Sequence, residues 1–485
     1  MESAYTYLVT GGAGFIGTNF IKLLRREEPE ARIVVLDALT YCGNIKSIAG
    51  EIERGEISFI KGDIGDSALV SGILHDYLPD YIINFAAESH VDRSLTDSRP
   101  FFTTNVGGTL NLLDCVKAQR TAQLAAGESP SLRKFVHIST DEVYGDLDID
   151  IPEGCPLPDD VNRRLGRGAE SRLYGSVSFC ESSPLRPSSP YSAAKASADL
   201  MVLAYKHSFG LPVCITRCSN NYGPYQHPEK LIPLMVNNIL ARKPLPVYGR
   251  GLNVRDWIHA DDHARGILAV AHAGRVGEVY NFGGYNERRN IDIVKLLIST
   301  VAAEVADNKG IDESLITYVN DRPGHDRRYA IDAAKSMDEL GWTPLIPFDK
   351  GIADTVRWYL ANQARKAAPS VHVRTDAIGN LIVFKKGKKS TGNRLMLAAH
   401  MDEVGIIITR ITEDGFLKFD FVGGVDRRVA IGKPVVIGEK KVPGVIGLKA
   451  VHLVSREERK KAPKTESLYI DIGAKDKESA EKLVE

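Results

Sequence analysis

A glycine-rich segment near the N-terminus, Gly11-Gly12-Ala13-Gly14-Phe15-Ile16-Gly17, constrains the fold of this chain most strongly. An apolar strand pattern at residues 5–10 precedes it, and a helical pattern through Phe20, Ile21 and Leu24 follows it. Glycines at this spacing make a tight turn, let the backbone approach a pyrophosphate and allow a helix to pack closely on a strand. The segment therefore predicts the first strand–turn–helix unit of a dinucleotide-binding sheet.

The second predicted strand, residues 32–36, ends at Asp37, which lies 20 residues after Gly17. An acid at this distance accepts a hydrogen bond from a ribose 2′-hydroxyl and repels a 2′-phosphate. The strand, turn, helix and acid together favour NAD over NADP as the cofactor.

The strand–helix alternation continues, with strands expected at residues 57–60, 81–85 and 135–139. Asp63, after the third strand, could meet the adenine, and the small residues Ala86 and Ala87 permit close approach to the cofactor. Strands and helices in this order predict an α/β fold with a doubly wound parallel sheet, whose ligands bind at the carboxyl ends of the strands.

Two adjacent carboxyl groups, Asp141 and Glu142, follow Thr140 at the end of one such strand. Carboxyls near a core are costly unless they have a partner or a task; a helix N-cap or a solvated turn is the structural alternative. Further on, Tyr191 and Lys195 are four residues apart, which on a helix places them on one face, where the ammonium could lower the pKa of the phenol. Together these groups offer an acid, a base and a tunable phenol.

The composition describes a folded chain with two or three cores, because 485 residues exceed one ordinary domain. The net charge is zero, which suggests no nucleic-acid or membrane partner, and no apolar run is long enough to span a bilayer. The six cysteines form no CxxC pair and are expected as reduced thiols. We therefore expect a cytoplasmic protein. From Lys366 onward, 23 basic against 16 acidic residues give +7, while 39 against 46 before it give −7, so the tail is a different kind of sequence.

The residues up to about Gln363 resemble the extended short-chain dehydrogenase/reductase superfamily and, within it, the dTDP-glucose 4,6-dehydratases. Asp-Glu directly after Thr140 is the feature that points to the dehydratases, since the other motifs are shared with epimerases and decarboxylases. The segments that carry the resemblance are the glycine-rich turn with Thr10, residues 39–44, 86–94, 139–145, 191–195, 217–224, 254–257 and 321–329.

The resemblance implies a mechanism that these residues can carry. Tyr191, assisted by Lys195, would take the proton of the sugar 4-hydroxyl while the C4 hydride passes to NAD. Thr140 would polarise the C4 oxygen. Glu142 would then abstract the C5 proton and Asp141 would protonate the departing 6-hydroxyl, after which the hydride returns to C6.

The resemblance also implies binding residues for the cofactor and for a dTDP-sugar, and a homodimer. The cofactor set is Gly11, Gly14, Phe15, Ile16, Gly17, Asp37, Thr40, Asp63, Ile64, Ala86, Ala87, Ser89, Tyr191 and Lys195. The substrate set is Ser89, His90, Thr140, Asn220, Lys230, Leu231, Pro246, Tyr248, Arg255, Asn290, Arg322, His325 and Tyr329. No metal is expected, since His90, His259 and His325 are not spaced as metal ligands.

Two alternatives remain open. One is another nucleotide-sugar enzyme of the same superfamily, an epimerase or decarboxylase, whose chemistry needs no acid pair. The other is a scaffold protein with a relict NAD site, against which the Tyr191 and Lys195 pair argues. Sequence does not decide between thymine and uracil as the base of the substrate.

The chain is expected to divide into residues 1–364, a Rossmann lobe with a smaller α/β substrate lobe built mainly from residue 220 onward, and residues 365–485, a β-rich appendage. Residues 146–187, polar and rich in proline and serine, predict an elaborated surface loop. The appendage resembles the first part of the two-metal glutamyl-aminopeptidases through residues 376–382 and 399–405. His400 and Asp402 match one metal ligand and its orienting acid, but the further ligands of that family are missing, so aminopeptidase activity is not expected.

Overall fold

The structure is a computed structural model that describes residues 5–158, 161–162, 164, 172–366, 371–375, 381–385, 405–422, 430–438, 441–448 and 464–484. It divides into two compact units, Met1–Phe384 and Lys385–Glu485. No helix among these residues is long and apolar enough to cross a membrane.

The first unit contains a parallel sheet of seven strands, which confirms the predicted doubly wound Rossmann architecture. β1 lies inside the sheet, where Leu8 pairs with Val34 on one side and Ile82 on the other. The chain winds outward in both directions from β1 and β4, so the order reverses between these two strands. Ligands of such sheets bind outside this switch point. In spatial order the strands are β12 (Val279–Phe282), β8 (Val213–Cys218), β5 (Lys134–Thr140), β4 (Tyr81–Asn84), β1 (Thr6–Thr10), β2 (Arg32–Asp37) and β3 (Ile57–Lys61).

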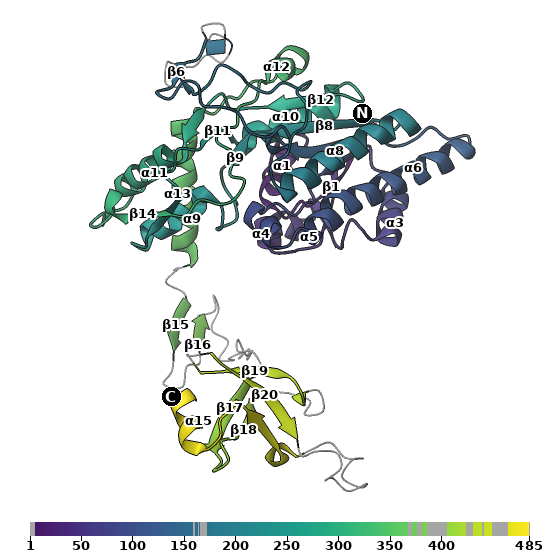
Figure 1. Cartoon of the computed structure of the whole chain (residues 1–485). Helices are drawn as coiled ribbons and strands as arrows, with labels where there is room; N and C mark the ends of the chain where they lie inside the picture. The colour runs from purple at the N-terminus through teal and green to yellow at the C-terminus, as the bar shows by residue number, and fades with distance from the viewer. Residues whose placement is uncertain are drawn as a thin grey trace. The chain divides into compact units, whose positions relative to one another are not determined.

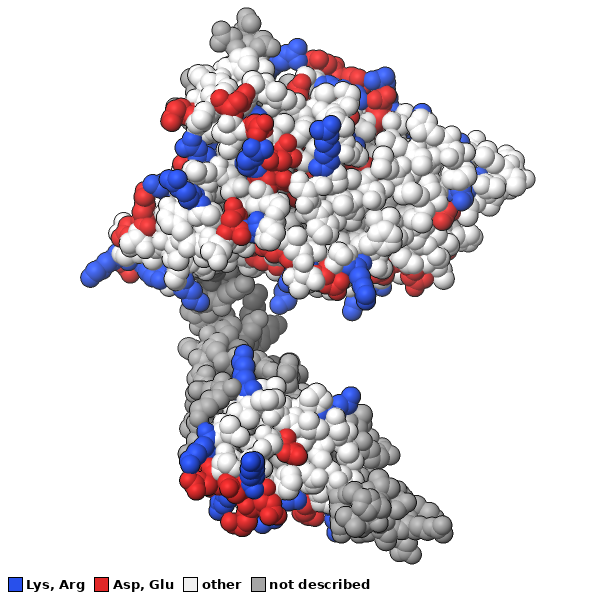
Figure 2. Space-filling model, viewed as in Figure 1, with Lys and Arg blue, Asp and Glu red and all other residues white. Residues whose placement is uncertain are grey.

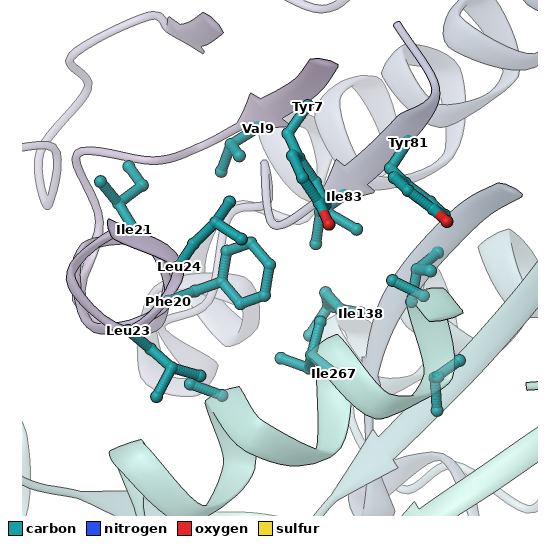
Figure 3. Close-up of a cluster of buried hydrophobic side chains, with 14 of the residues drawn as sticks. Tyr7, Val9, Phe20, Ile21, Leu23, Leu24, Tyr81, Ile83, Ile138 and Ile267 are labelled. Carbon is teal, nitrogen blue, oxygen red and sulfur yellow. The ribbon is translucent and has the colours of Figure 1, made fainter. Parts of the chain in front are cut away.

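Helices cover both faces of the sheet, because alternate strand residues point to opposite faces and both sets are apolar. Figure 3 shows Phe20 and Leu24 of α1 packed toward Tyr7, Val9 and Ile83 of the sheet. Val9 thus faces one helical layer, while its neighbour Leu8 belongs to the core of the other layer. The first layer contains α1 (Phe15–Glu27), α10 (Ala260–Ala273) and α12 (Ala334–Leu340), and the second contains α3 (Ser67–Tyr77), α6 (Thr109–Ala125) and α8 (Pro190–Phe209).

Short helical segments lie in the connections of the Rossmann lobe. One of them, η2 (Phe102–Gly108), is a π-helix that continues directly into α6, a type of turn that is rare and often found at functional sites. The others are η1 (Ile45–Ser47), α2 (Ala49–Glu53), α4 (Val91–Thr96), α5 (Arg99–Phe101) and η3 (Asp141–Val143).

The smaller lobe has its own apolar core between three helices, to which Val236, Leu297 and Val356 each contribute a side chain. Its helices are grouped together in Figure 1, away from the helices that cover the large sheet. This agrees with the predicted α/β substrate lobe. The elements are α9 (Leu231–Leu240), α11 (Asn290–Glu304), α13 (Phe348–Lys366), η4 (Glu313–Leu315), a three-stranded sheet of β13 (Glu287–Arg289), β11 (Val254–His259) and β9 (Asn220–Tyr222), and the parallel pair β10 (Leu245–Tyr248) and β14 (Ile316–Val319).

The insertion predicted as a surface loop is anchored by a buried ion pair. Arg328, 1% exposed, pairs with Glu287 at 2.7 Å and also donates to the carbonyls of Gly175 and Val177. Glu287 in turn accepts a hydrogen bond from the backbone N–H of Tyr174. The described part of the insertion includes the short antiparallel pair β6 (Cys155–Pro156) and β7 (Arg172–Leu173). These contacts tie the insertion to β13, which carries Glu287, and to the irregular segment that carries Arg328.

The second unit confirms the β-rich C-terminal region. Its core is formed by Leu417, Phe419, Ile446, Leu468 and Ile470. The five-stranded sheet has the order β17 (Gly405–Ile411), β18 (Leu417–Val422), β21 (Leu468–Asp471), β20 (Val442–Leu448) and β19 (Pro434–Ile437), with η7 (Thr465–Ser467) and α15 (Lys477–Val484) beside it in sequence. A separate pair, β15 (Val371–Thr375) and β16 (Leu381–Lys385), precedes it in the chain.

Candidate active site

A cleft of about 300 Å³ lies at the carboxyl ends of the central strands. It collects residues that follow β1, β2, β4, β5 and β8, as expected for a ligand site at the switch point of a doubly wound sheet. Every predicted cofactor-binding residue and every predicted catalytic residue lines it, namely Gly11, Gly14, Phe15, Ile16, Gly17, Asp37, Thr40, Asp63, Ile64, Ala86, Ala87, Ser89, Thr140, Asp141, Glu142, Tyr191 and Lys195.

The glycine-rich turn is closed so tightly that side chains cannot replace two of its glycines. Gly11 has φ +69°, and a Cβ there would lie 2.6 Å from the backbone nitrogen of Ala86. A Cβ on Gly17 would lie 2.6 Å from the carbonyl oxygen of Gly11. The turn leads into α1, whose N-cap Gly14 offers no side-chain cap. The first N–H groups of α1 are therefore directed at the cleft, where a pyrophosphate would be stabilised by them and by the helix dipole.

Replacing Gly11 by alanine should remove the cofactor while leaving the chain folded. The left-handed backbone costs about 1–3 kcal/mol for a non-glycine residue, and the Cβ would also displace the segment at Ala86. We expect the NAD content of the purified variant to fall at least about tenfold, which corresponds to about 1.4 kcal/mol of binding. Gly55→Ala is the matched control, because Gly55 has the same φ of +69° with nothing within 4 Å of its Cβ position. Equal NAD content in both variants would contradict this account of the turn.

Asp37 is fixed in place before any ligand binds. It is 7% exposed, and its carboxylate accepts hydrogen bonds from the backbone N–H groups of Ala13 at 2.9 Å and Leu39 at 2.7 Å. Burial raises the pKa of Asp37, and these two hydrogen bonds act in the opposite direction. Its carboxylate therefore joins the glycine-rich turn to the loop after β2, in the position where a ribose 2′-hydroxyl would be recognised. The tight turn and this acid fit a bound NAD.

The two carboxyl groups after β5 are held by a short helix that Thr140 caps. The hydroxyl of Thr140 accepts from the backbone N–H of Glu142 at 3.3 Å and donates to Asp141 at 3.3 Å. Asp141 is only 2% exposed, and its second carboxyl oxygen has no hydrogen-bond partner among the described residues. The structural alternative of a solvated turn is therefore excluded for Asp141, which lies buried on the wall of the cleft.

Burial raises the pKa of both carboxyl groups, but the charges around Asp141 and around Glu142 differ. Burial, followed by the charges of Glu142 and Asp256, raises the pKa of Asp141 well above its usual range. Burial also raises the pKa of Glu142, but the cations Arg322, Arg255 and Lys230 oppose it. A carboxyl group that keeps its proton can act as an acid, and one stabilised by cations can act as a base.

Tyr191 and Lys195 both lie on α8, as predicted, and both are buried. The capping box of Ser189 and Ser192 begins this helix and fixes its first turn. The prediction that Lys195 lowers the pKa of Tyr191 is not met in the structure. Burial raises the pKa of Tyr191 well above its usual range, and Glu142 adds to this effect. Burial is thus the main cause, and the ammonium of Lys195 itself donates to the carbonyl of Ile138 at 2.5 Å.

Of the predicted substrate residues, Ser89, Thr140, Asn220 and Lys230 line the cleft. The ammonium of Lys230 donates to the backbone carbonyl of Ser89 at 2.8 Å and thereby connects the two lobes. His90 lies next to this contact as the N-cap of α4, with its ring nitrogen 3.5 Å from Glu229. Burial lowers the pKa of His90 and of Lys230.

A second group of predicted substrate residues, Arg322, Tyr248 and His325, lies outside the cleft lining. Arg322 is one of the cations that act on Glu142. Arg322 pairs with Asp92 at 3.1 Å, and the hydroxyl of Tyr248 donates to the same carboxylate at 3.2 Å. The ring of Tyr248 meets that of His325 edge-on at 6.0 Å. These residues come from β10, the start of α4 and the segment after β14.

Arg255, a predicted substrate residue, is held in place by contacts within the protein. It is 5% exposed and donates to the carbonyls of Val254 at 2.7 Å and Asp326 at 2.8 Å, with the ring of Tyr329 4.1 Å from its guanidinium carbon. A guanidinium has five donors, so these contacts leave others for a ligand. The remaining predicted substrate residues lie outside the cleft lining at the starts of α9 and α11 and in β10, namely Leu231, Asn290 and Pro246.

Several cleft residues were not predicted from sequence. Thr104 lies on the π-helix η2. The side-chain amide of its neighbour Asn105 accepts a hydrogen bond from the backbone N–H of Glu88 at 2.8 Å and donates one to the backbone carbonyl of Glu88 at 3.0 Å. Sequence offered no signal for these residues, because a π-helix, with its wider i→i+5 turns, has no sequence pattern of its own. The others are Leu36, Ala38, Cys42, Gly43, Gly62, Phe85, Glu88, Ile138, Ser139, Cys218, Ser219, Asn221, Gln226 and His227, most of them neighbours of predicted residues.

Known proteins resemble the first unit closely. The model of the NAD dependent epimerase/dehydratase family matches residues 7–283. A dTDP-glucose 4,6-dehydratase of Xanthomonas campestris pv. campestris is 49% identical over 359 residues, which cover 74% of this chain and 94% of that protein. The corresponding enzyme of Salmonella typhimurium is 46% identical over 355 residues, covering 73% and 92%.

Solved structures give the same result. The crystal structure of the dTDP-glucose 4,6-dehydratase DesIV from Streptomyces venezuelae, with NAD bound, has 44% sequence identity and a TM-score of 0.62, and covers 74% of this chain and 98% of that chain. A UDP-glucose 4-epimerase of Thermus thermophilus in complex with NAD has 25% identity and a TM-score of 0.59, covering 73% and 99%.

The C-terminal segment matches a different family. The model of the M42 glutamyl aminopeptidases matches residues 379–485, which confirms the resemblance noted from sequence. His400 and Asp402, the residues that carried it, lie outside the residues that the structure describes. Within the described ranges, no group of three or more His, Cys, Asp and Glu side chains could hold a metal ion.

The cleft with its glycine-rich turn and the two sets of relatives indicate the same family for the first three quarters of the chain. With 49% identity to a relative that it covers over 94% of its length, the chain belongs to the NAD dependent epimerase/dehydratase family, in the group of the dTDP-glucose 4,6-dehydratases.

Proposed function

We propose that this protein converts dTDP-glucose to dTDP-4-keto-6-deoxyglucose and that NAD is its recycled cofactor. The observation that carries the proposal is the pair Asp141 and Glu142 in one cleft with Tyr191 and Lys195, with burial raising the pKa of Asp141 and cations beside Glu142. Bound NAD would supply the acceptor and the later donor of a hydride.

Tyr191 begins the reaction as the base for the sugar 4-hydroxyl. Its pKa is raised by burial and by Glu142, so the phenolate that accepts the proton forms only when positive charge is near the phenol. Lys195 is the nearest candidate on the same helix, and the nicotinamide ring would add to it. Thr140, whose hydroxyl already orders the carboxyl pair, would hydrogen-bond the C4 oxygen. The outcome of this step is a 4-ketone.

The ketone makes the C5 proton acidic, and the carboxyl pair then removes water. Glu142 takes the C5 proton, the C5–C6 double bond forms, the C6–oxygen bond breaks, and Asp141 gives its proton to the leaving hydroxide. Elimination therefore moves one proton to Glu142 and one from Asp141, and it releases one water. The raised pKa of Asp141 keeps that proton available at neutral pH.

The nucleoside diphosphate would lie against the smaller lobe. Arg322, Arg255 and Lys230 are the cations on that side of Glu142, and guanidinium groups suit bidentate contacts to phosphate. The roles of His90, Asn220, Leu231, Pro246, Tyr248, Asn290, His325 and Tyr329 in substrate binding remain predictions.

A 4-epimerase or decarboxylase is the main alternative, and one solved relative at 25% identity is a UDP-glucose 4-epimerase. Neither reaction removes water across C5 and C6, so neither needs the acid pair to take the C5 proton and protonate a leaving 6-hydroxyl. A scaffold with a relict site would not need Tyr191 and Lys195 in a cleft that could still hold NAD. Offering dTDP-glucose and UDP-glucose separately, without added NAD, tests the proposal. A 4-keto-6-deoxy product from dTDP-glucose is expected, and an epimer from UDP-glucose would overturn it.

We further propose that two copies associate through the outer face of α8. Leu200 is 59% and the nearby Phe102 66% exposed, and the same side of α8 presents the small residues Ala193, Ser197 and Ala204. Figure 2 shows a broad area with few charged side chains on this side of the first unit. A large exposed apolar area on a folded protein indicates an interaction surface. Cytoplasmic location remains a prediction from sequence.

We also propose that residues 1–364 form the enzyme and that residues 365–485 are dispensable for its activity. Deleting residues 366–485 should leave turnover of dTDP-glucose unchanged within about twofold, because every residue lining the cleft lies between Gly11 and Lys230. We expect the shortened chain to be more soluble, since apolar side chains such as Val436, which is 69% exposed, are removed with it. Turnover per active site, counted by bound NAD, is the measurement. A large loss of turnover in a folded, NAD-loaded truncation would contradict the proposal.

A further inference from the structure

Lys195 is a buried cation whose charge needs an explanation. It is 4% exposed, and the only hydrogen bond that its ammonium makes to a described residue is to the carbonyl of Ile138, on the cleft wall. Burial lowers the pKa of Lys195 to about 8, and the charge of Asp199 is the largest effect that opposes this. Without an anion nearby, a buried lysine loses its proton.

Asp199 is the anion at this position. It lies one helical turn after Lys195 on α8, so both side chains are on the same face. It is fully buried, and its Oδ2 accepts from Nε of Arg217 at 2.9 Å. Its Oδ1 lies 3.7 Å from Nε2 of His137. Burial raises the pKa of Asp199, and Arg217, Lys195 and the hydroxyl of Ser139 oppose this effect. This buried carboxylate therefore pairs with Arg217 and lies on the same helix face as the buried ammonium of Lys195.

The other groups packed around this carboxylate carry no charge that could replace it. On β5, burial and the charges of Lys195 and Arg217 lower the pKa of His137 well below its usual range, so that ring is neutral. On β8, burial raises the pKa of the Cys218 thiol, which keeps it neutral as well. Arg217 is held on its far side by the hydroxyl of Tyr144 at 2.9 Å, which donates in turn to Asn281 at 2.8 Å.

We propose that Asp199, which lies outside the cleft lining, is a positioning residue for the dehydration reaction: its carboxylate is the counter-charge that keeps the Lys195 ammonium charged and directed at Ile138. A buried ion pair is often no more stabilising than apolar residues of the same size, so stability alone gives little reason for it. The inference rests on the proposed function, because only there does Lys195 need its charge, when Tyr191 takes the proton of the 4-hydroxyl.

Asp199→Asn tests this inference, because it keeps the shape of the side chain and an acceptor for Arg217 while it removes the charge. In the proposed mechanism, kcat falls at alkaline pH when Lys195 loses its proton. Removing the Asp199 carboxylate should therefore move this alkaline limb of the kcat profile toward lower pH. We expect a shift of at least about one unit. The ε-carbon resonance of Lys195, followed by NMR and assigned with Lys195→Arg, should titrate at a correspondingly lower pH.

Three further variants separate positioning from folding. Tyr144→Phe removes a hydrogen bond to Arg217 with all charges kept, so it should lower the thermal midpoint without moving the alkaline limb. Asp199→Glu keeps the negative charge, so the fall of kcat at high pH should return most of the way to the pH seen in the unaltered protein. If Asp199→Asn does not fold, Asp199→Asn with Arg217→Gln removes the pair together, and the same downward shift is expected.

The inference would be overturned if the folded Asp199→Asn variant lost only stability, while the alkaline limb of kcat and the NMR titration of Lys195 stayed as in the unaltered protein. That result differs from failure of the proposed function, in which the unaltered protein gives no 4-keto-6-deoxy product at any pH.

Discussion

Glu142→Gln should stop the reaction after oxidation at C4. Glutamine keeps the shape of the side chain but cannot accept the C5 proton, and removal of a general base costs about 10²–10⁴ in rate. We expect release of 4-keto-6-deoxy product to fall by this factor, while reduced nicotinamide accumulates slowly in the variant. Absorbance of NADH and chromatography of the sugar nucleotide measure the two steps separately.

Deuterated water makes the assignment of Glu142 specific. In Asp141→Asn, the base is intact, so recovered dTDP-glucose should gain deuterium at C5 although no water is eliminated. In Glu142→Gln, it should gain none. Glu88→Gln is the matched control, because Glu88 is another glutamate of the same cleft with a pKa raised by burial. If Glu88→Gln and Glu142→Gln lost product formation equally, or if Glu142→Gln exchanged the C5 proton, another group would be the base.

Tyr191→Phe should abolish the reaction one step earlier. Phenylalanine fills the same space among Phe101 and Ala194 but has no hydroxyl to take the proton of the sugar. Oxidation at C4 should slow by about 10²–10⁴, and no reduced nicotinamide should accumulate, even combined with Glu142→Gln. Stopped-flow absorbance after mixing with dTDP-glucose is the measurement.

Tyr41→Phe provides the comparison for Tyr191. The hydroxyl of Tyr41 lies 3.4 Å from that of Ser89, and its charge acts on the pKa of Tyr191. Tyr41→Phe therefore removes a phenol hydroxyl from the same surroundings while the proposed base, Tyr191, stays in place. We expect at most about a tenfold effect, the value of a lost hydrogen bond of about 1.4 kcal/mol. Accumulation of NADH in Tyr191→Phe at the rate of the unaltered protein would contradict the role of Tyr191.

The cofactor half of the site could be predicted from sequence because its constraints are local. Gly11, Gly17 and Asp37 are set by one strand–turn–helix–strand unit, and their spacing alone gives the turn, the close approach and the acid. The position of Asp141 and Glu142 followed in the same way from the end of β5, since the carboxyl ends of parallel strands share one edge. The comparisons then gave the family that these motifs indicated.

The parts that could not be predicted depend on contacts between distant residues. The insertion was expected as a surface loop, but its anchor is Arg328 with Glu287, 41 positions apart and both 1% exposed. The direction of the Lys195 ammonium toward Ile138 follows from packing of α8 on β5, which no periodicity shows. For the same reason the pKa of Tyr191 was expected to be lowered and is raised.

The smaller lobe shows the limit of motif reasoning most clearly. Arg255 belongs to a recognisable motif, yet its guanidinium is oriented by the carbonyls of Val254 and Asp326 and by the ring of Tyr329. A motif predicts that such a residue matters, but only the tertiary structure gives its partners. The second unit was recognised as β-rich, but β18 and β20 were not predicted. Glycines interrupt the apolar pattern of β20. In β18, Leu417 and Phe419 alternate with charged residues as in a half-buried strand, so its pattern could have been found.

The central claim is that one cleft oxidises C4, removes water across C5 and C6, and returns the same hydride to C6. dTDP-glucose carrying deuterium at C4 tests this most directly when it is given to the purified protein without added NAD. The account predicts a 4-keto-6-deoxy product whose methyl group carries the deuterium that left C4. A product without that deuterium, a 4-epimer that keeps its 6-hydroxyl, or no product even with NAD supplied would contradict it.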